Sequence, residues 1–157
     1  MKTKKSWKDK LSDSKDLPKV KVIREEQEKR WGKGTIAIPS PLEVDAIMKT
    51  VPRGRIITIN GIRKQVAKKH DATIGCPITT GIFAWIAANA ADEDPKPEKG
   101  LTPYWRTLRN GGIINEKYPG GIEKQAMLLE EEGHQIIQKG KQWVVADWEE
   151  TEFGEAT

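Results

Sequence analysis

Cys76 carries the only thiol in this sequence, so it is the obvious candidate for nucleophilic chemistry. A reactive cysteine needs a base or a positive charge nearby that keeps its sulfur ionised. His70 lies six positions upstream, but no spacing rule makes the two a catalytic dyad, and Cys76 stands directly before Pro77 in a predicted turn. A small buried side chain is therefore the favoured interpretation, and residual enzymatic chemistry through Cys76 is the weaker alternative.

Metal and cofactor chemistry have little support in the sequence. The two histidines, His70 and His134, lie far apart, and one cysteine allows neither an intramolecular disulfide nor a Cys-rich zinc cluster. No apolar run approaches the roughly 20 residues that span a bilayer. The charged N-terminus also lacks the hydrophobic stretch of a secretory signal. We expect no metal, no cofactor, no membrane contact and a reducing cytoplasmic location.

Positive charge is the clearest functional signal. The 157 residues carry a net charge of +4, yet residues 1–33 hold 12 Lys and Arg against 6 Asp and Glu, which leaves the remainder slightly acidic. Within that remainder, residues 49–70 contain seven basic side chains and no acid. A solvated helix face usually carries compensating acids, so this window indicates a phosphate-contacting surface. We predict contacts to DNA from five of its members: Arg53, Arg55, Arg63, Lys64 and Lys68.

Three helices are expected to position these side chains. Ser40-Pro41-Leu42-Glu43 is a capping box followed by apolar residues on one helical face, and a second helix follows from about Asn60. A third helix, capped by Thr79 or Thr80, runs through Ile82–Ala91. The last two helices form a helix-turn-helix pattern. The third helix offers no Lys, Arg or Gln to base edges, so we expect shape-based or minor-groove binding without sequence preference.

The rest of the chain predicts small hairpins and polar ends. Residues 104–108 form a strand that returns through Asn110-Gly111-Gly112 as a candidate wing, and a second hairpin surrounds Lys139-Gly140-Lys141. We expect a basic flexible arm over 1–35, a mostly helical α/β winged helix-turn-helix domain over 36–146, and a solvated acidic tail over 147–157. Residues 92–100 form a polar loop. A monomer is expected.

Several separated motifs occur in a consistent order over about residues 42–138. They are Val51-Pro52-Arg53-Gly54 before the second helix, Asn89 near the end of the third helix, Pro103-Tyr104-Trp105-Arg106, Tyr118-Pro119-Gly120-Gly121-Ile122, and Glu132-Gly133. Together they resemble the DNA-binding domain of the alkylguanine-DNA alkyltransferases, which carry Pro-Cys-His-Arg at the third of these motifs. The resemblance implies that family's helix-turn-helix fold.

The departures from that family fall on its chemistry. By the resemblance, Tyr104 replaces the alkyl-accepting cysteine and Trp105 replaces the activating histidine, so no transfer reaction is expected. Ile59 stands for the tyrosine that helps to rotate a nucleotide, and Thr80 for the arginine that fills the vacated space. Glu132 matches the relay glutamate and could accept the indole N–H of Trp105, although a solvated helix-end carboxylate is the favoured interpretation. In this pattern the chain resembles the alkyltransferase-like proteins, which lack the acceptor cysteine and bind alkylated DNA.

The sequence thus predicts a non-enzymatic protein that binds duplex DNA, with possible recognition of alkylated or distorted sites. Beyond the basic side chains, the predicted contacts are Thr79 and Thr80 at a helix start and Asn89. A degenerate active-site pocket is expected at Pro103, Tyr104, Trp105 and Arg106. The alternative is a protein–protein interaction module that kept the fold and lost DNA binding, supported by the acidic tail and six tryptophans.

Overall fold

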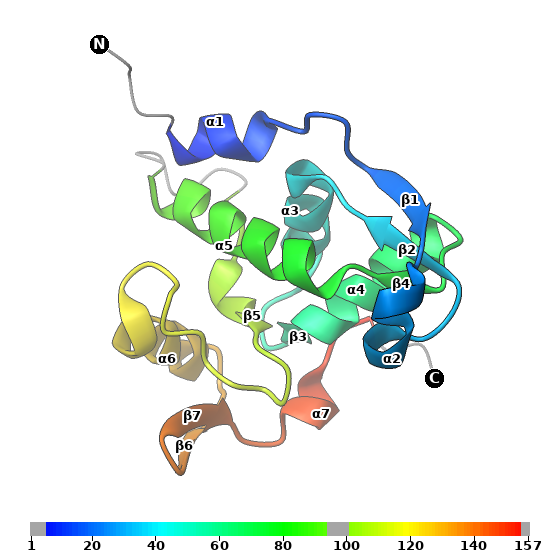
Figure 1. Ribbon diagram of the computed structural model, residues 1–157. Helices are drawn as coiled ribbons and strands as arrows, with labels where there is room; N and C mark the ends of the chain where they lie inside the picture. The colour runs from blue at the N-terminus through cyan, green and yellow to red at the C-terminus, as the bar shows by residue number, and fades with distance from the viewer. Residues whose placement is uncertain (1–5, 94–100, 155–157) are drawn as a thin grey trace.

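The computed structural model of the chain describes residues 6–93 and 101–154. Three helices pack together at its centre (Figure 1): α3 (Pro41–Lys49), α4 (Ile59–Lys69) and α5 (Pro77–Glu93). Alanines on α5 let the other two helices approach it closely. The central cluster includes Val44, Met48, Ile62, Val66, Ala84, Ala87 and Ala88, all fully buried. The structure confirms the mostly helical α/β class.

Local signals explain where these helices begin. The Ser40 hydroxyl accepts the backbone N–H of Glu43 at 3.2 Å, as the capping box predicts, and the Thr58 hydroxyl caps α4 through Gly61. Helix α5 begins at Pro77, not at Thr79 or Thr80. Proline is pre-organised for a first helical turn, where its missing N–H costs nothing. The start of this helix was therefore predicted too late.

The turn between α4 and α5 is held very close to α4. It contains the short strand β4 (Ile74–Gly75), and a Cβ atom at Gly75 would overlap the backbone of Arg63. Only glycine permits this approach without displacing one of the two segments. The helix-turn-helix order of α4 and α5 agrees with the sequence prediction.

A second, smaller cluster lies on the other side of the segment around Trp105. It is formed by β3 (Ile57–Thr58) paired in parallel with β5 (Thr107–Leu108), by α6 (Gly121–Glu131), and by the hairpin of β6 (Ile136–Lys139) and β7 (Gln142–Val145). Ile56, Leu108, Leu129 and Val145 are fully buried there. The hairpin predicted around Lys139-Gly140-Lys141 is confirmed.

The candidate wing at Asn110-Gly111-Gly112 differs from the predicted hairpin. Tyr104–Arg106 forms a 3₁₀ turn, η2, instead of a strand, and only one bridge, Arg109 to Ile113, joins the two sides of the turn. The reason is competition between partners. Strand β5 pairs with β3, while Ile113 bridges to Val144 of β7.

The N-terminal residues differ from the expected flexible arm. From residue 6 onward they form α1 (Trp7–Ser12), β1 (Lys19–Val22), η1 (Glu25–Gln27), α2 (Glu28–Trp31) and β2 (Thr35–Ile38). Helix α1 lies along α5, and β1 pairs with β2 in an antiparallel ladder. Apolar anchors explain the order: Leu11 packs on the central cluster, and Ile23 and Trp31 pack with Ile36 and Cys76. Residues 1–5 of the predicted arm lie outside the described part.

The acidic C-terminal residues also differ from the solvated tail that composition predicts. They form α7 (Trp148–Thr151), after which the Phe153 N–H donates to the Ile56 carbonyl at 2.7 Å and the Phe153 side chain packs on the central cluster. Residues 155–157, like residues 94–100 of the predicted polar loop, lie outside the described part. No helix in the described residues is long and apolar enough to cross a membrane.

Candidate nucleic-acid interface

The expected pocket at Tyr104 is closed. The Tyr104 side chain is only 3% exposed, and its ring packs edge-to-face against Trp105 and Tyr118, at centroid distances of 5.5 and 5.8 Å. Its hydroxyl donates to the Pro119 carbonyl at 3.3 Å, and Pro103 is buried beside it. Burial raises the pKa of the phenol, which keeps it protonated at neutral pH. Residues 103–106 therefore form packed core and do not line an alkyl-binding cavity.

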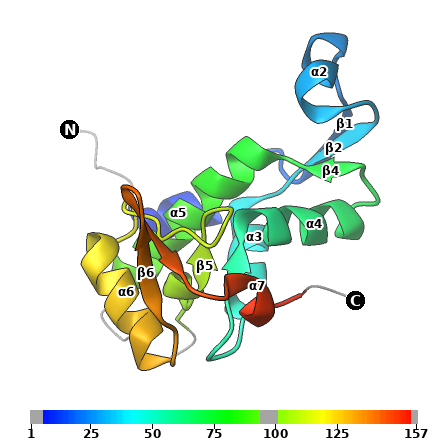
Figure 2. The same cartoon turned by 90° about the horizontal axis from the view of Figure 1, so that it is seen from below.

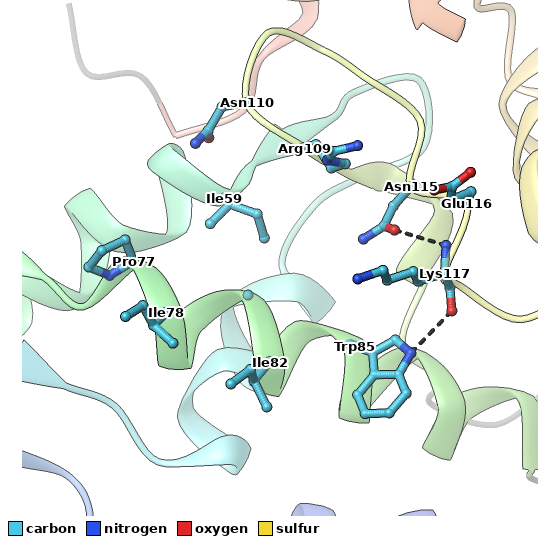
Figure 3. A pocket seen from close by; sticks show the side chains of 11 residues that line it. Ile59, Pro77, Ile78, Ile82, Trp85, Arg109, Asn110, Asn115, Glu116 and Lys117 are labelled. Carbon is cyan, nitrogen blue, oxygen red and sulfur yellow. Dashed lines mark hydrogen bonds between the residues drawn. The ribbon is translucent and has the colours of Figure 1, made fainter. Parts of the chain in front are cut away.

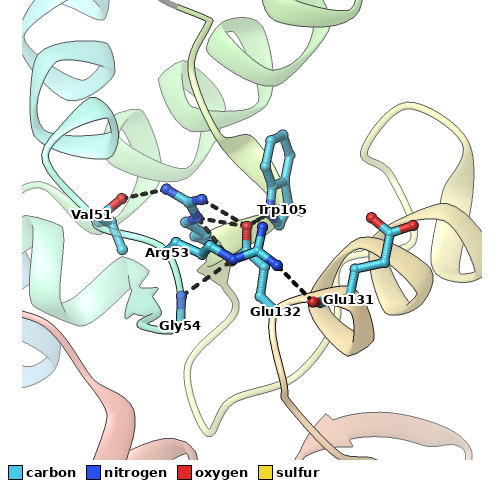
Figure 4. Close-up of polar contacts among 7 residues, drawn as sticks. Val51, Arg53, Gly54, Trp105, Glu131 and Glu132 are labelled. Carbon is cyan, nitrogen blue, oxygen red and sulfur yellow. Dashed lines mark hydrogen bonds and ion pairs between the residues drawn. The ribbon is translucent and has the colours of Figure 1, made fainter.

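Glu132 is the centre of a polar network behind this segment (Figure 4). Its side chain is 4% exposed and accepts the Trp105 indole N–H at 2.9 Å, together with Arg106 Nη2 at 2.7 Å and Nε at 2.9 Å. Arg106 Nη1 donates to the Val51 carbonyl at 2.8 Å, and the Gly54 N–H reaches Glu132 Oε1 at 3.5 Å. The prediction of a solvated carboxylate is wrong, because a bidentate arginine compensates the charge that burial would otherwise penalise.

The network also fixes the protonation of Glu132. Burial alone would raise the pKa of this carboxyl. The hydrogen bonds from Arg106 and Trp105, with the positive charge of Arg106, outweigh that penalty, and the net pKa lies below the usual glutamate range. Glu132 is therefore ionised in the folded protein, and Arg106 has a structural role.

An open pocket lies on the exposed side of α5 instead (Figure 3). Its volume is about 710 Å³, and three segments form it: the start of α4, one face of α5, and the loop 109–117. Side chains that line it include Ile59, Ile78, Ile82, Trp85, Arg109 and Lys117. Ile78, Ile82 and Trp85 are 55%, 46% and 36% exposed, which makes an apolar face on the helix predicted to recognise DNA.

Two hydrogen bonds hold the loop 109–117 over this pocket. The Trp85 indole N–H donates to the Lys117 carbonyl at 3.1 Å, and the Asn60 N–H donates to Asn110 Oδ1 at 2.8 Å. A third support is the fully buried Gln125, whose Oε1 accepts the Asn115 N–H and whose Nε2 donates to the carbonyls of Trp105 and Thr107. The loop is therefore fixed from α4, from α5 and from the core.

A second, smaller pocket adjoins the first at the start of α4. Its volume is about 390 Å³, and its lining includes Asn60, Arg63, Lys64 and Gly75. Arg63 Nε donates to the Gly75 carbonyl and Nη1 to Asn60 Oδ1, both at 2.8 Å. Ile59 lines the first pocket and the next residue, Asn60, lines the second, so both pockets lie at the start of α4. Two of the five predicted basic contacts, Arg63 and Lys64, line the smaller pocket.

The other predicted contacts are more scattered. Lys68 is exposed one turn further along α4, while Arg53 lies beside α6, where it donates to the Glu131 carbonyl at 2.9 Å, and Arg55 reaches the Glu150 carbonyl at 3.5 Å. Basic residues close in sequence are separated here because the turn 52–55 carries two of them to the opposite end of β3.

The geometry of α5 corrects two of its three predicted polar contacts, Thr79 and Thr80, while a DNA contact of Asn89 stays a prediction. Thr80 is fully buried and its N–H donates to Cys76, so it offers no group to a phosphate. The Thr79 hydroxyl oxygen is also buried. Asn89 does not end the helix, which continues to Glu93, and its amide donates to the Trp85 carbonyl at 2.9 Å. The helix start that was predicted too late accounts for the errors at Thr79 and Thr80.

Sequence reasoning missed the residues that form the open pocket, above all Ile82, Trp85, Arg109 and Lys117. Their spacing gives a partial signal, because Ile78, Ile82 and Trp85 recur at i, i+4 and i+7 on one helical face. The pattern alone does not distinguish a buried stripe from an exposed one. Cys76 is 6% exposed in the cluster with Ile23 and Ile36, which agrees with its interpretation as a small core side chain.

The architecture is similar to that of two solved structures from S. pombe. One is Atl1 in complex with damaged DNA containing O6-carboxymethylguanine, with a TM-score of 0.51 and 21% sequence identity. The other is an S. pombe ATL in complex with DNA, with a TM-score of 0.51 and 20% identity. Each match covers 72% of this chain and 93% of the other. No protein-family model and no curated protein matches the sequence. The similarity confirms the alkyltransferase-like fold.

Replacing Glu132 by Gln tests the buried network. We expect Glu132→Gln to lower the free energy of unfolding by about 3 kcal/mol at pH 7, because Arg106 loses its buried counter-charge. A depressed pKa stabilises the fold above the ordinary glutamate pKa of about 4.3, and this contribution is lost as the pH falls through the lower folded-state value. Denaturant unfolding between neutral and acidic pH should therefore show a shallower acid dependence in the variant.

Glu131→Gln is the matched control, because Glu131 is the exposed neighbour and, among the described residues, its carboxylate has no hydrogen bond or ion pair. Equal stability and equal acid dependence of the two variants would contradict the assignment.

Proposed function

We propose that this chain is a non-enzymatic protein that binds duplex DNA against α5 and the open pocket beside it. The observation that carries the proposal is the position of that pocket. It lies between an exposed helix of the helix-turn-helix and a fixed loop, in a fold shared with proteins whose structures contain bound DNA.

The side chains on this surface favour contacts to shape and backbone over base reading. The exposed face of α5 presents Ile78, Gly81 and Ile82, which have no hydrogen-bond donors for base edges, and the space around Gly81 is open. Apolar side chains of this kind suit the sugar walls of a minor groove. Arg63 and Lys64 on one flank and Arg109 and Lys117 on the other lie where they can contact phosphates.

The pocket further supports recognition of an altered base. Its size falls in the range of about 300–1,000 Å³ that small-molecule sites occupy, and its walls combine apolar Ile59, Ile82 and Trp85 with the amide of Asn115. A base turned out of the helix would find a flat apolar surface and polar groups at the rim. An alkylated or mispaired base is the best occupant, because unstacking it costs least.

The absence of transfer chemistry is the third part of the proposal. Tyr104 and Trp105 stand where a thiolate and its base would be required, and the phenol is buried with a raised pKa. Cys76 is buried in a different cluster, against Ile23 and Ile36. The residues that line the open pocket do not include Tyr104, Trp105 or Cys76.

Incubation with an oligonucleotide that contains O6-methylguanine tests this part directly. We expect intact-mass measurement to show no methyl added to the protein, since the single thiol, Cys76, is buried in another cluster and does not line the pocket. A mass increase of one methyl group that disappears in Cys76→Ser would show that the protein is an alkyltransferase after all.

One observation favours a second candidate function, a protein–protein interaction module. The exposed apolar face of α5, with Ile78 and Ile82 about half exposed, would also suit a protein partner. The two functions differ in their need for positive charge around this face, because only DNA binding requires the surrounding cations.

Ile82→Glu discriminates between these functions when it is paired with Met127→Glu. Both side chains are exposed helical apolar residues, at 46% and 51%, but only Ile82 lines the pocket. We expect Ile82→Glu to raise the Kd for a duplex by at least about tenfold, or 1.4 kcal/mol, by placing a negative charge against phosphates. Met127→Glu should leave the Kd within about twofold, as expected for a site outside the interface.

Fluorescence anisotropy with a labelled duplex provides the measurement. Equal effects of the two variants would remove α5 from the interface. The chain is an interaction module if the wild-type protein binds no duplex but captures a protein partner. That partner must remain bound after nuclease treatment and must no longer be captured by the Ile82→Glu variant.

A further inference from the structure

Residues 19–34 form a projection attached to the turn of the helix-turn-helix. We refer to these residues, which contain β1, η1 and α2, as the N-terminal extension. Figure 2 shows α2 and the ends of β1 and β2 projecting beyond α4 and α5. Figure 1 places the same segments next to β4, at the end of α5 where that helix begins.

The extension is fixed to this turn by backbone pairing and a small core. Strand β2 pairs with β1 on one side and with β4 on the other, where Ile36 faces Ile74 and Ala37 faces Gly75. The Cys76 N–H, one residue before α5, donates to the Ala37 carbonyl at 2.9 Å. Two hydrogen bonds between Thr35 and Thr73 add to this attachment. The position of the extension relative to α5 is therefore set by the fold.

Its surface is basic. Between residues 19 and 33, six basic side chains stand against three acidic ones, for a net charge of +3. Lys21, Arg24, Lys29, Arg30 and Lys33 are all exposed. Within the described residues, no ion pair engages Lys21, Lys29, Arg30 or Lys33, whereas Lys19 pairs with Asp16 at 2.7 Å. An excess of exposed cations, several of them outside any ion pair, suits a polyanionic partner.

We propose that the N-terminal extension is a second DNA-contacting surface, which binds phosphates of the duplex that flanks the site at α5. This inference rests on the function proposed above. Charge complementarity and the attachment of the extension next to the smaller pocket argue for duplex DNA as the occupant. Arg63 and Lys64 lie beside Ile74 and Gly75 in the smaller pocket, and β4 is the strand that leads on to the extension. The protein then contacts DNA beyond the length of α5.

The test compares two charge-removal variants of equal chemistry. Lys29→Gln/Lys33→Gln alters the extension, and Lys139→Gln/Lys141→Gln alters the turn of the β6–β7 hairpin, away from both pockets. All four lysines are exposed, and each pair flanks a glycine turn. The Kd for an unmodified duplex is measured at several salt concentrations, with thermal melting to verify that each variant is folded.

We expect the extension variant to bind with a salt slope shallower by about 1.8, the value for two lost phosphate contacts, while the hairpin variant keeps the wild-type slope. Equal slopes for both variants and the wild type, or an equal loss in both variants, would overturn the inference. The inference would also be overturned if the extension variant lost the wild-type binding to poly-L-glutamate but kept the wild-type binding to DNA. That result would assign the surface to an acidic protein. Failure of the wild type to bind any duplex would contradict the proposed function itself, so the two failures are distinguishable.

Discussion

The buried carboxylate of Glu132 is the interaction on which the arrangement of the molecule depends. It joins the end of α6 to the turn at Gly54 and to Trp105 and Arg106, and Arg106 continues to the Val51 carbonyl. Trp105 packs against both hydrophobic clusters, so the network lies where the two cores meet. An ionised group at that position is tolerated only because several donors converge on it. The segments that frame the helix-turn-helix are placed relative to one another by this contact.

The network accounts for the closed packing at Tyr104 and for the open surface beside it. Where a transfer enzyme needs an accessible nucleophile, this chain has Tyr104 packed between two aromatic rings and Trp105 bound to Glu132. The same residues contribute to a rigid wall behind the loop 109–117, through the hydrogen bonds of Gln125. The loop, held also by Trp85 and Asn110, leaves a pocket beside α5. The segment around Tyr104 is therefore packed, and the pocket proposed to bind DNA lies beside α5.

The sequence could predict the elements whose signals are local. The capping box at Ser40, the helix from about Asn60 and the glycine turn at 140 depend on neighbouring residues only, and the structure agrees with them. The ordered structure of residues 6–31 and 148–154 could not be predicted from composition, because charged residues dominate these segments. Their position is set by single apolar side chains such as Trp31 and Phe153. The burial of Glu132 depends on its contact with Arg106, which is 26 positions away in the sequence, and no local pattern predicts that contact. For the same reason, the pocket was expected at Tyr104 and lies at Ile82.

The central claim is that duplex DNA binds to the surface formed by α5 and the open pocket. A titration of the wild-type protein with a plain duplex, the same duplex carrying one O6-alkylguanine, and a single strand tests it most directly, at two salt concentrations. The account predicts that both duplexes bind at low salt, that the alkylated duplex binds more tightly, and that affinity falls roughly a hundredfold when salt is raised fourfold, as four phosphate contacts require. Absence of binding to either duplex at low salt would contradict it.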